Sequence, residues 1–365
     1  MIFGVMVIHS EITSRERVLL GLKHKETDRI PFSLGFGVNE PAKKDLQLYL
    51  RLKDQNEVDE YLNGYSDLRH LHPEYIGPKD RNKVFPDGSG IDRWGIKRVL
   101  VSYGAGFYEE ISEYPLKNIT DISELSQYEW SSVDWHCSDN LKEQISRLNK
   151  DGGYCIVLGN GNIFETSWYM RGFEQMLIDI MTEPELAWEL MTRVTDYYIS
   201  YFTKMLQAAD GMIDIVFTAD DLGHQEGPIM SVDLWDEMIK PHHVRLNKVL
   251  HEYGVKVMYH TDGAVMDFVP GLIDMGIDIL EALQFDAKDM DPALLKEKYG
   301  DRLCFHGGVS VQKTLPFGTP QDVELETKER IRVLGKNGGY ILAPSHVIQA
   351  GTPPENIVAF LEASR

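Results

Sequence analysis

Short apolar segments alternate with longer amphipathic segments over the second part of the chain, from about residue 151 to residue 365. The apolar segments have the length and bounding residues of buried strands, and the segments between them have the 3.6-residue period of helices. We predict strands at residues 154–158, 213–218, 255–260, 278–283, 303–309 and 340–344, and helices at residues 183–206, 232–253, 291–299 and 321–335. Strands and helices that alternate in this way indicate a parallel sheet covered by helices.

The pattern is less regular before residue 151. Thr13 and Glu16 have the spacing of a capping box, which predicts a helix through about residue 25, and residues 31–36 follow it as a predicted strand. Residues 39–150 are rich in Tyr and Pro and contain one short amphipathic stretch at 45–52. Because this region lacks a long periodic core, we interpret it as an elaborated N-terminal region of a single domain that spans residues 1–365.

Two nucleotide-binding motifs are absent, and this changes the fold prediction. Neither GxGxxG nor GxxxxGK[ST] follows the first predicted strands, so a nucleotide-binding doubly wound sheet loses its main support. The α/β fold that remains is a (β/α)8 TIM barrel with an N-terminal insertion. We identify seven of its eight strands.

The net charge and the cysteines limit the kinds of partner and the cellular compartment that we expect for this protein. The chain has 37 Lys and Arg against 57 Asp and Glu, a net charge of −20, which disfavours nucleic acid and anionic membrane surfaces. The three cysteines are far apart, which argues against a disulfide framework or a thiolate zinc site. The apolar residues 1–8 are too short for a membrane span and lack the basic start of a signal peptide. We therefore expect a cytoplasmic protein.

Polar side chains follow five successive predicted strands, and in a barrel these strand ends meet at one face. The residues are Asp220, Asp221, His260, Asp262, Glu281, Gln284, His306 and His346. Taken singly, several have ordinary structural explanations: Asp220 as a helix cap, His260 as a half-buried histidine and Asp262 as a turn residue. Their recurrence on five strands favours a functional site.

The spacing of these residues suggests a metal centre. His260-x-Asp262 places two possible ligands on the same face of one strand end, and Glu281 follows one strand–helix unit later. Two imidazoles, from His260 and His346, with one or two carboxylates suit a divalent ion, and Zn²⁺ is our first choice. The alternative is a hydrogen-bonded His–Asp pair that binds no metal.

Four segments resemble the uroporphyrinogen decarboxylase superfamily. They are TSRERVLLGLKHKETDRI at 13–30, LPFGTPQDV at 315–323, YILAPSH at 340–346 and TPPENI at 352–357. The resemblance covers nearly the whole chain. It implies a (β/α)8 barrel whose active site lies at the carboxyl ends of the strands.

Resemblance to the decarboxylases themselves implies a cofactor-free reaction and a set of candidate residues. The catalytic candidates are Asp92, Tyr169, Asp220 and His346. To these we add Trp168, Arg171, Gln284 and His306 as our own substrate-binding candidates. The decarboxylases also grip their substrate's carboxylates with arginines of an N-terminal motif. The corresponding residues 30–37, IPFSLGFG, contain no arginine, which argues against this activity.

A second branch of the superfamily, the corrinoid-linked methyltransferases, binds zinc through His-x-Cys and a late Cys. The corresponding positions here are His260-x-Asp262 and His346, and Glu281 matches a glutamate ligand of the similar cobalamin-independent methionine synthase. The resemblance thus implies zinc ligation by His260, Asp262, His346 and Glu281. The absence of thiolate ligands favours an oxygen or nitrogen acceptor over a thiol.

Three hypotheses follow. The first is a zinc-dependent methyltransferase that moves a methyl group between a corrinoid on a partner protein and a small acceptor, and we favour it. The second is a decarboxylase of uroporphyrinogen or a related carboxylate. The third is a non-catalytic partner of a carrier protein, against which the five polar strand ends argue. The partners we consider are a small-molecule substrate, a corrinoid protein and a second copy of the chain.

Overall fold

The fold is described from a computed structural model for residues 12–102, 104, 106–149 and 153–365. The apolar residues 1–8 lie outside this described part of the chain. Among the described residues, none of the helices combines the length and apolar character needed to cross a bilayer.

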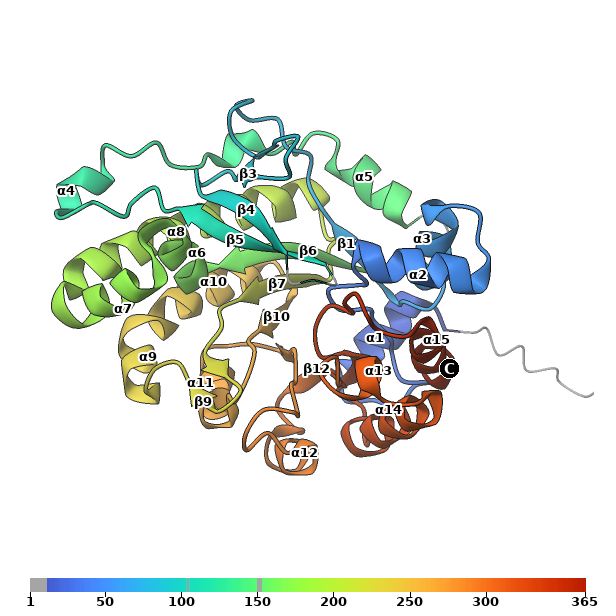
Figure 1. The fold of residues 1–365 in the computed structure, drawn as a ribbon. Helices are drawn as coiled ribbons and strands as arrows, with labels where there is room; N and C mark the ends of the chain where they lie inside the picture. The colour runs from blue at the N-terminus through green and yellow to red at the C-terminus, as the bar shows by residue number, and fades with distance from the viewer. Residues whose placement is uncertain (1–11, 103, 105, 150–152) are drawn as a thin grey trace, which may run out of the picture.

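A seven-stranded parallel sheet forms the centre of the molecule (Figure 1). In spatial order its strands are β1 (Leu68–Leu71), β6 (Cys155–Asn162), β7 (Ile215–Ala219), β10 (Lys256–His260), β11 (Ile279–Glu281), β12 (Cys304–Val309) and β13 (Tyr340–Pro344). The six strands predicted after residue 151 are confirmed within a few residues at their ends. The missed strand is β1, which lies in the irregular region because its Arg69 and His70 interrupt the apolar pattern.

The segment around Phe32 joins the two edges of this sheet. On one side Ser33 N–H donates to Leu342 of β13 at 2.9 Å, and on the other Asp67 N–H donates to Phe32 at 2.8 Å. The strand expected at residues 31–36 is thus only a bridge at Phe32, because Gly35 and Gly37 turn the chain with positive φ. This bridge completes the eight-membered TIM-barrel pattern, so the predicted fold class is confirmed.

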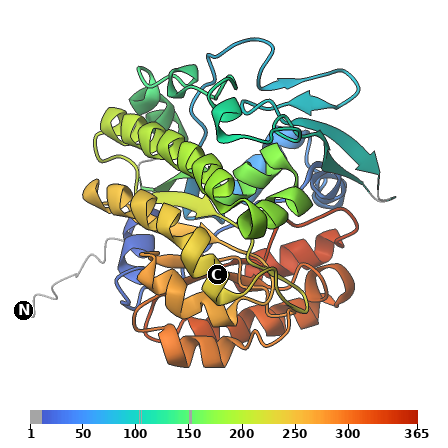
Figure 2. The ribbon, with the colours of Figure 1, turned by 90° about the vertical axis from the view of Figure 1, so that its left-hand side faces the viewer.

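Helices surround the sheet (Figures 1 and 2). They are α1 (Ser14–Gly21), α2 (Glu40–Leu50), α3 (Gln55–Asn63), α4 (Ile122–Leu125), α5 (Leu141–Leu148), α6 (Ile163–Arg171), α7 (Phe173–Thr182), α8 (Pro184–Ala209), α9 (Val232–Met238), α10 (Lys240–Glu252), α11 (Val269–Asp274), α12 (Pro292–Tyr299), α13 (Thr314–Phe317), α14 (Pro320–Leu334) and α15 (Pro354–Ala363). The helix predicted at 232–253 is two helices, because Pro241 cannot donate the backbone bond that would continue α9. The capping box at Thr13 is present at the start of α1.

Two smaller sheets lie outside the barrel. An antiparallel sheet contains β2 (Lys83–Val84), β3 (Gly90–Ile91), β4 (Lys97–Ser102) and β5 (Phe107–Glu113). A two-stranded ribbon contains β8 (Gly223–His224) and β9 (Gly227–Pro228). The larger sheet lies within the region interpreted as an elaboration and has mostly exposed side chains.

Alternation along the strands separates an inner from an outer core. The inner residues include Val157, Ile215, Met258, Ile279 and Ile341, and Val18 of α1 and Leu22 just after it join this cluster. Because side chains two positions apart share a face, His260, Glu281 and His306 face the barrel interior like Met258, Ile279 and Cys304 before them. Strand parity therefore brings three polar residues to one end of the barrel.

Candidate metal centre at the carboxyl ends of the strands

His260 and Glu281 form the buried centre of the site. They are register partners at the ends of β10 and β11, and His260 Nδ1 is hydrogen-bonded to Glu281 Oε2. The other carboxylate oxygen of Glu281 lies 3.7 Å from His306 Nδ1. Gly307 permits this close approach of β11 and β12, since a Cβ there would lie 1.9 Å from the Ala282 carbonyl oxygen.

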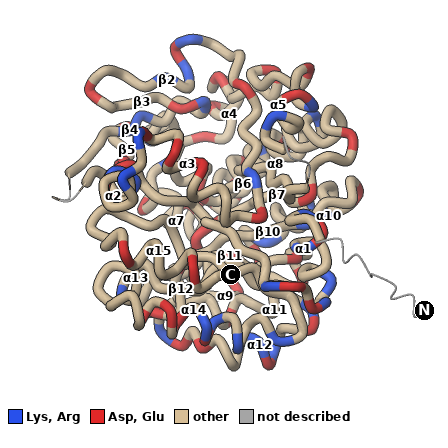
Figure 3. Tube along the Cα trace, turned by 90° about the vertical axis from the view of Figure 1, so that its right-hand side faces the viewer, with Lys and Arg blue, Asp and Glu red and all other residues tan. Residues whose placement is uncertain are grey.

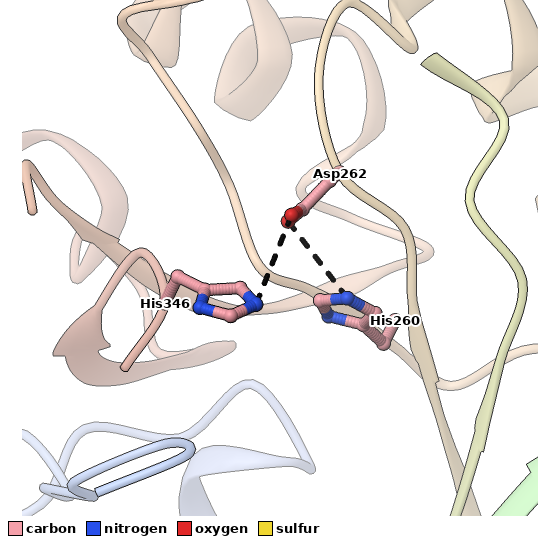
Figure 4. Close-up of side chains that lie close together, drawn as sticks. All are labelled: His260, Asp262 and His346. Carbon is pink, nitrogen blue, oxygen red and sulfur yellow. Dashed lines mark ion pairs between the residues drawn. The ribbon is translucent and has the colours of Figure 1, made fainter. Parts of the chain in front are cut away.

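His260, Asp262 and His346 offer three donor atoms that lie within 4.8 Å of one another (Figure 4). Asp262 Oδ1 is 3.8 Å from His260 Nε2, and Asp262 Oδ2 is 3.9 Å from His346 Nε2. Donors that share a tetrahedral zinc ion lie about 3.3 Å apart, so a small inward movement would suffice. Asp262 Oδ1 is also buried and has no hydrogen-bond partner among the described residues, which is the state expected of an oxygen that a cation would satisfy. These residues fit a divalent ion.

Glu281 was expected as a further ligand, but the structure places it outside this three-residue group. Its contact with Nδ1 leaves Nε2 of His260 directed to Asp262. A carboxylate behind a ligand histidine orients the ring and increases its basicity. We therefore assign Glu281 to the positioning of His260.

Electrostatics at the site follow from burial and from the number of carboxylates. Burial favours neutral imidazole, but Glu281, Asp262 and Asp221 outweigh it and raise the pKa of His260 to about 10. Burial, and then the repulsion of Asp221 and Glu281, raise the pKa of Asp262 to about 7. Burial together with His260 lowers the pKa of His346. A bound cation would replace the proton on this crowded cluster.

Asp221 and Glu165 also belong to the site, and neither was selected from the sequence for a catalytic role. Asp221 Oδ1 lies 3.7 Å from His260 Nε2 and accepts from the Asp262 N–H at 3.0 Å. Burial, followed by Asp221 and Asp220, raises the pKa of Glu165 to about 8. Glu165 accepts a hydrogen bond from the Tyr169 hydroxyl at 3.1 Å. The Asp220-Asp221 pair was visible in the sequence, but Glu165 lies in an apolar helix that gives no such signal.

Asp220 has a different environment from its neighbour. Its carboxylate accepts from the N–H groups of Phe164 and Glu165 at 2.9 and 2.7 Å, and it contacts His243 Nε2 at 2.5 Å. It is completely buried. The expected catalytic role of Asp220 finds no support in this geometry, which instead anchors the start of α6 to β7.

Of the remaining predicted residues, some lie near the His260–Glu281 centre and one, Arg171, belongs to a separate hydrogen-bond network. Tyr169 and Gln284 lie near the centre: Tyr169 contacts Glu165, and Gln284 Oε1 accepts from the Gly263 N–H at 3.1 Å. Trp168 packs edge-on against Tyr169 at a centroid distance of 4.2 Å. Arg171 is bound instead to Asp179 and to the carbonyls of residues 116, 117 and 119, so its expected substrate role finds no support.

Asp92 lies in the turn between β3 and β4 of the antiparallel sheet rather than at a strand end of the barrel. Its Oδ1 accepts from the N–H groups of Trp94 and Ile96, which forms a tight turn. Its Oδ2 is 3.9 Å from Arg98, whose guanidinium lies 4.8 Å from the Tyr169 ring. Asp92 is thus connected to Tyr169 through Arg98.

A cavity of about 760 Å³ lies beside the metal-ligand candidates. Glu281, His306 and Phe36 line it, and the Phe36 ring packs against both His260 and His346 at 4.9 and 4.8 Å. His70 of β1 also lines it, and burial, with His72 and His306, lowers its pKa to about 4. This volume suits a small organic molecule.

One solved structure with a similar fold covers nearly the whole of both chains. A methyltransferase from Methanosarcina mazei superposes with a TM-score of 0.68 at 19% sequence identity, covering 97% of this chain and 98% of that chain. D-psicose 3-epimerase from Clostridium cellulolyticum gives a TM-score of 0.38 at 11% identity, covering 66% and 84%. No match was found among curated proteins. The family model for uroporphyrinogen decarboxylase (URO-D) matches residues 101–365. This match spans most of the chain, which therefore belongs to the uroporphyrinogen decarboxylase family.

Proposed function

We propose that this protein is a zinc-dependent methyltransferase that moves a methyl group between a corrinoid carried by a partner protein and a small acceptor. The observation that carries the proposal is the three-donor group of His260, Asp262 and His346 at the mouth of the barrel. Three protein ligands and an open position are typical of catalytic zinc. The similarity of fold to the Methanosarcina methyltransferase over 97% of the chain supports the same proposal.

The donor set favours zinc among the divalent ions. Two imidazole nitrogens and one carboxylate oxygen suit zinc better than magnesium or calcium, which prefer oxygen ligands. When bound, the ion supplies Lewis acidity that lowers the pKa of an acceptor's O–H or N–H group.

The protein's own residues position this chemistry. Glu281 holds the ring of His260, and Phe36 packs against His260 and His346 to exclude water from one side. Asp221, with a side chain 38% exposed, lies beside His260 and takes the acceptor's proton. The corrinoid would supply the methyl group and keep the electron pair of the bond that breaks, and the acceptor would form the new bond with the lone pair that loss of its proton to Asp221 leaves free.

The size of the cavity argues for a corrinoid on a separate protein. A cavity of about 760 Å³ is the right size for a drug-sized molecule. A corrinoid is considerably larger than that, so the carrier protein presents it at the mouth of the cavity. We also propose that two copies of this chain form a homodimer.

The test uses free methylcobalamin as the methyl donor and a panel of small alcohols, amines and thiols as acceptors. We expect loss of methylcobalamin absorbance with the zinc-loaded protein under anaerobic conditions. Chelation of the metal, or His346→Ala, should lower the rate at least about 100-fold, since the ion supplies several kcal/mol of transition-state stabilisation. His251→Ala is the control, because His251 is half exposed and pairs with Asp278 away from the site. Transfer that is unaffected by chelation would contradict the proposal.

A carboxy-lyase activity is the second candidate. The URO-D family match over residues 101–365 favours it. Its substrate would be uroporphyrinogen or a related carboxylate, and turnover of uroporphyrinogen tests it.

A further inference from the structure

Arg93 lies in the wall of the cavity, away from the residues assigned above to catalysis. The Asp92 turn holds the backbone on both sides of it, through hydrogen bonds to the N–H groups of Trp94 and Ile96. Tyr75, His136 and Tyr201 line the cavity with it. Glu281 and His306, which adjoin the candidate metal ligands, line the same cavity.

The partners of Arg93, which is partly exposed, differ from those of the buried arginines Arg17 and Arg171. Arg17 pairs with Asp67 at 2.8 Å, and Arg171 pairs with Asp179 at 2.6 Å. Within the described residues, no carboxylate oxygen lies within 4.0 Å of the Arg93 guanidinium, and Nε is buried without a hydrogen-bond partner. Asp92, its neighbour in sequence, is directed to Arg98 instead.

Aromatic groups surround this guanidinium. It lies 5.9 Å from the Trp94 ring and 5.8 Å from the Tyr197 ring, and Tyr198 also interacts with its charge. Burial, and then Arg93 itself, lower the pKa of His136 to about 4, so this histidine is neutral at pH 7. Arg93 therefore keeps its positive charge among neutral groups.

The other charged groups of the cavity are already compensated. Lys43 pairs with Asp59 at 2.9 Å, and Glu281 is bound to His260. Arg69 donates to backbone carbonyls of residues 63, 66 and 68. A charge that is partly removed from water and has no counterion is costly in a protein, and the net charge of −20 makes carboxylates plentiful elsewhere in this chain. The missing counterion of Arg93 is thus a feature of the cavity.

We propose that Arg93 forms an anion subsite of this cavity and binds the carboxylate group of a small substrate whose other end reaches the candidate metal centre. The inference rests on the proposed function, because it names the substrate class of the same site. A guanidinium offers a planar pair of donors that matches a carboxylate, and such charge-assisted bonds are strong in a site shielded from water. The acceptor is accordingly a small carboxylic acid that also bears a hydroxyl or amine.

The experiment measures binding of succinate, succinamide and inorganic phosphate to the metal-loaded protein by calorimetry and thermal unfolding. Succinate should bind and raise Tm by about 2–5 °C at about 100 times its Kd, whereas succinamide, its neutral amide, should not. In Arg93→Met the Kd for succinate should rise at least about tenfold. Arg193→Met is the matched control, since Arg193 also lies over a tryptophan but outside the cavity lining.

Thermal unfolding without any probe separates a binding role from a structural one. If the role of Arg93 is to bind a ligand, Arg93→Met removes an uncompensated charge from the free protein, and its Tm is unchanged or higher. A lower Tm with undiminished succinate binding would overturn the proposal, as would equal binding of succinate and succinamide. Binding of phosphate alone would overturn the carboxylate assignment. Arg93→Lys keeps the charge without the planar fork, and it should retain part of the affinity if Arg93→Met does not fold.

Metal content separates this proposal from the proposed function. If the protein binds no metal but Arg93 still controls succinate binding, the proposed function fails and the anion subsite stands. If the protein binds metal and Arg93→Met does not alter anion binding, the subsite fails and the metal centre stands.

Discussion

At the residue scale, the pair of His260 and Glu281 determines what the site can hold. Strand parity explains why both face the barrel interior, and this could be predicted from the sequence. The sequence does not predict whether Glu281 binds the metal itself or orients a ligand, because that depends on which carboxylate contacts which ring nitrogen. The same limit applies to Asp220 and Asp221: neighbours at a strand end face opposite sides, and only the structure shows which one meets His260.

Glu281→Gln tests the positioning role. We expect zinc affinity to fall by about 10–100-fold, because the amide holds the ring of His260 but no longer increases its basicity. Competition with a chromophoric chelator measures the affinity, and His251→Gln serves as the control. An unchanged affinity would mean that Glu281 does not act through His260.

At the element scale, Asp67 connects the first segment of the barrel to β1. Its carboxylate accepts from Arg17, Arg29 and the Phe32 N–H, all at 2.8 Å. The strand β1 and its link through Asp67 were not predicted, because residues 68–71 are not continuously apolar. The segment at residues 31–36 was expected in the barrel, but as a strand and not as the single bridge at Phe32. The regular strands after residue 151 were predicted because burial on both faces keeps them apolar.

Asp67→Asn should lower the free energy of unfolding by about 3–5 kcal/mol, since it leaves buried arginine charge without its partner. Urea denaturation measures this change. Asp28→Asn is the control: Asp28 also pairs with Arg17 but its side chain is 47% exposed, so the cost should stay below about 1 kcal/mol. Equal effects of the two substitutions would contradict the assigned closure.

Helices α8 and α10 pack against each other (Figure 2). A histidine buried at this contact makes the stability of the fold depend on pH. His242 of α10 lies against the Trp188 ring at 4.4 Å, with Nδ1 3.3 Å from the Thr195 hydroxyl. Burial, followed by the charges of His243 and Arg245, lowers the pKa of His242 to about 3. The unfolded chain takes up a proton near pH 6.5 whereas the folded chain does not, so stability falls as pH decreases below about 6.5.

We expect His242→Gln to reduce the loss of unfolding free energy between pH 7 and pH 5 by about 1–2 kcal/mol. Urea denaturation of both proteins at the two pH values measures the difference. His251→Gln is the control, because that ring is exposed and paired with Asp278. An identical pH dependence in His242→Gln and the unsubstituted protein would show that His242 is not neutral in the folded state.

At the scale of the whole molecule, acidic and basic residues are interspersed around the fold (Figure 3), and the net charge is −20. A porphyrinogen carries several carboxylates that each require a cationic partner. Among the cations that line the cavity, Lys43 is paired with Asp59 and Arg69 donates to carbonyls, which leaves Arg93. The small number of cationic side chains without a carboxylate or carbonyl partner suits a substrate with few carboxylates.

We therefore expect turnover of uroporphyrinogen to be absent or very slow. Chromatography of the products after anaerobic incubation measures it, with an authentic decarboxylase as the positive control. Turnover at about 1 per second or faster would favour the carboxy-lyase over the methyltransferase.

The central claim is that His260, Asp262 and His346 hold one divalent ion. Metal analysis of the protein, loaded with zinc at about pH 7 and freed of excess ion, tests it most directly. We predict about one equivalent of zinc in the unsubstituted protein and nearly none in His260→Ala, with the fold of both verified by circular dichroism. Less than about a tenth of an equivalent in the unsubstituted protein would contradict the claim and leave His260 and Asp262 as an acid–base pair.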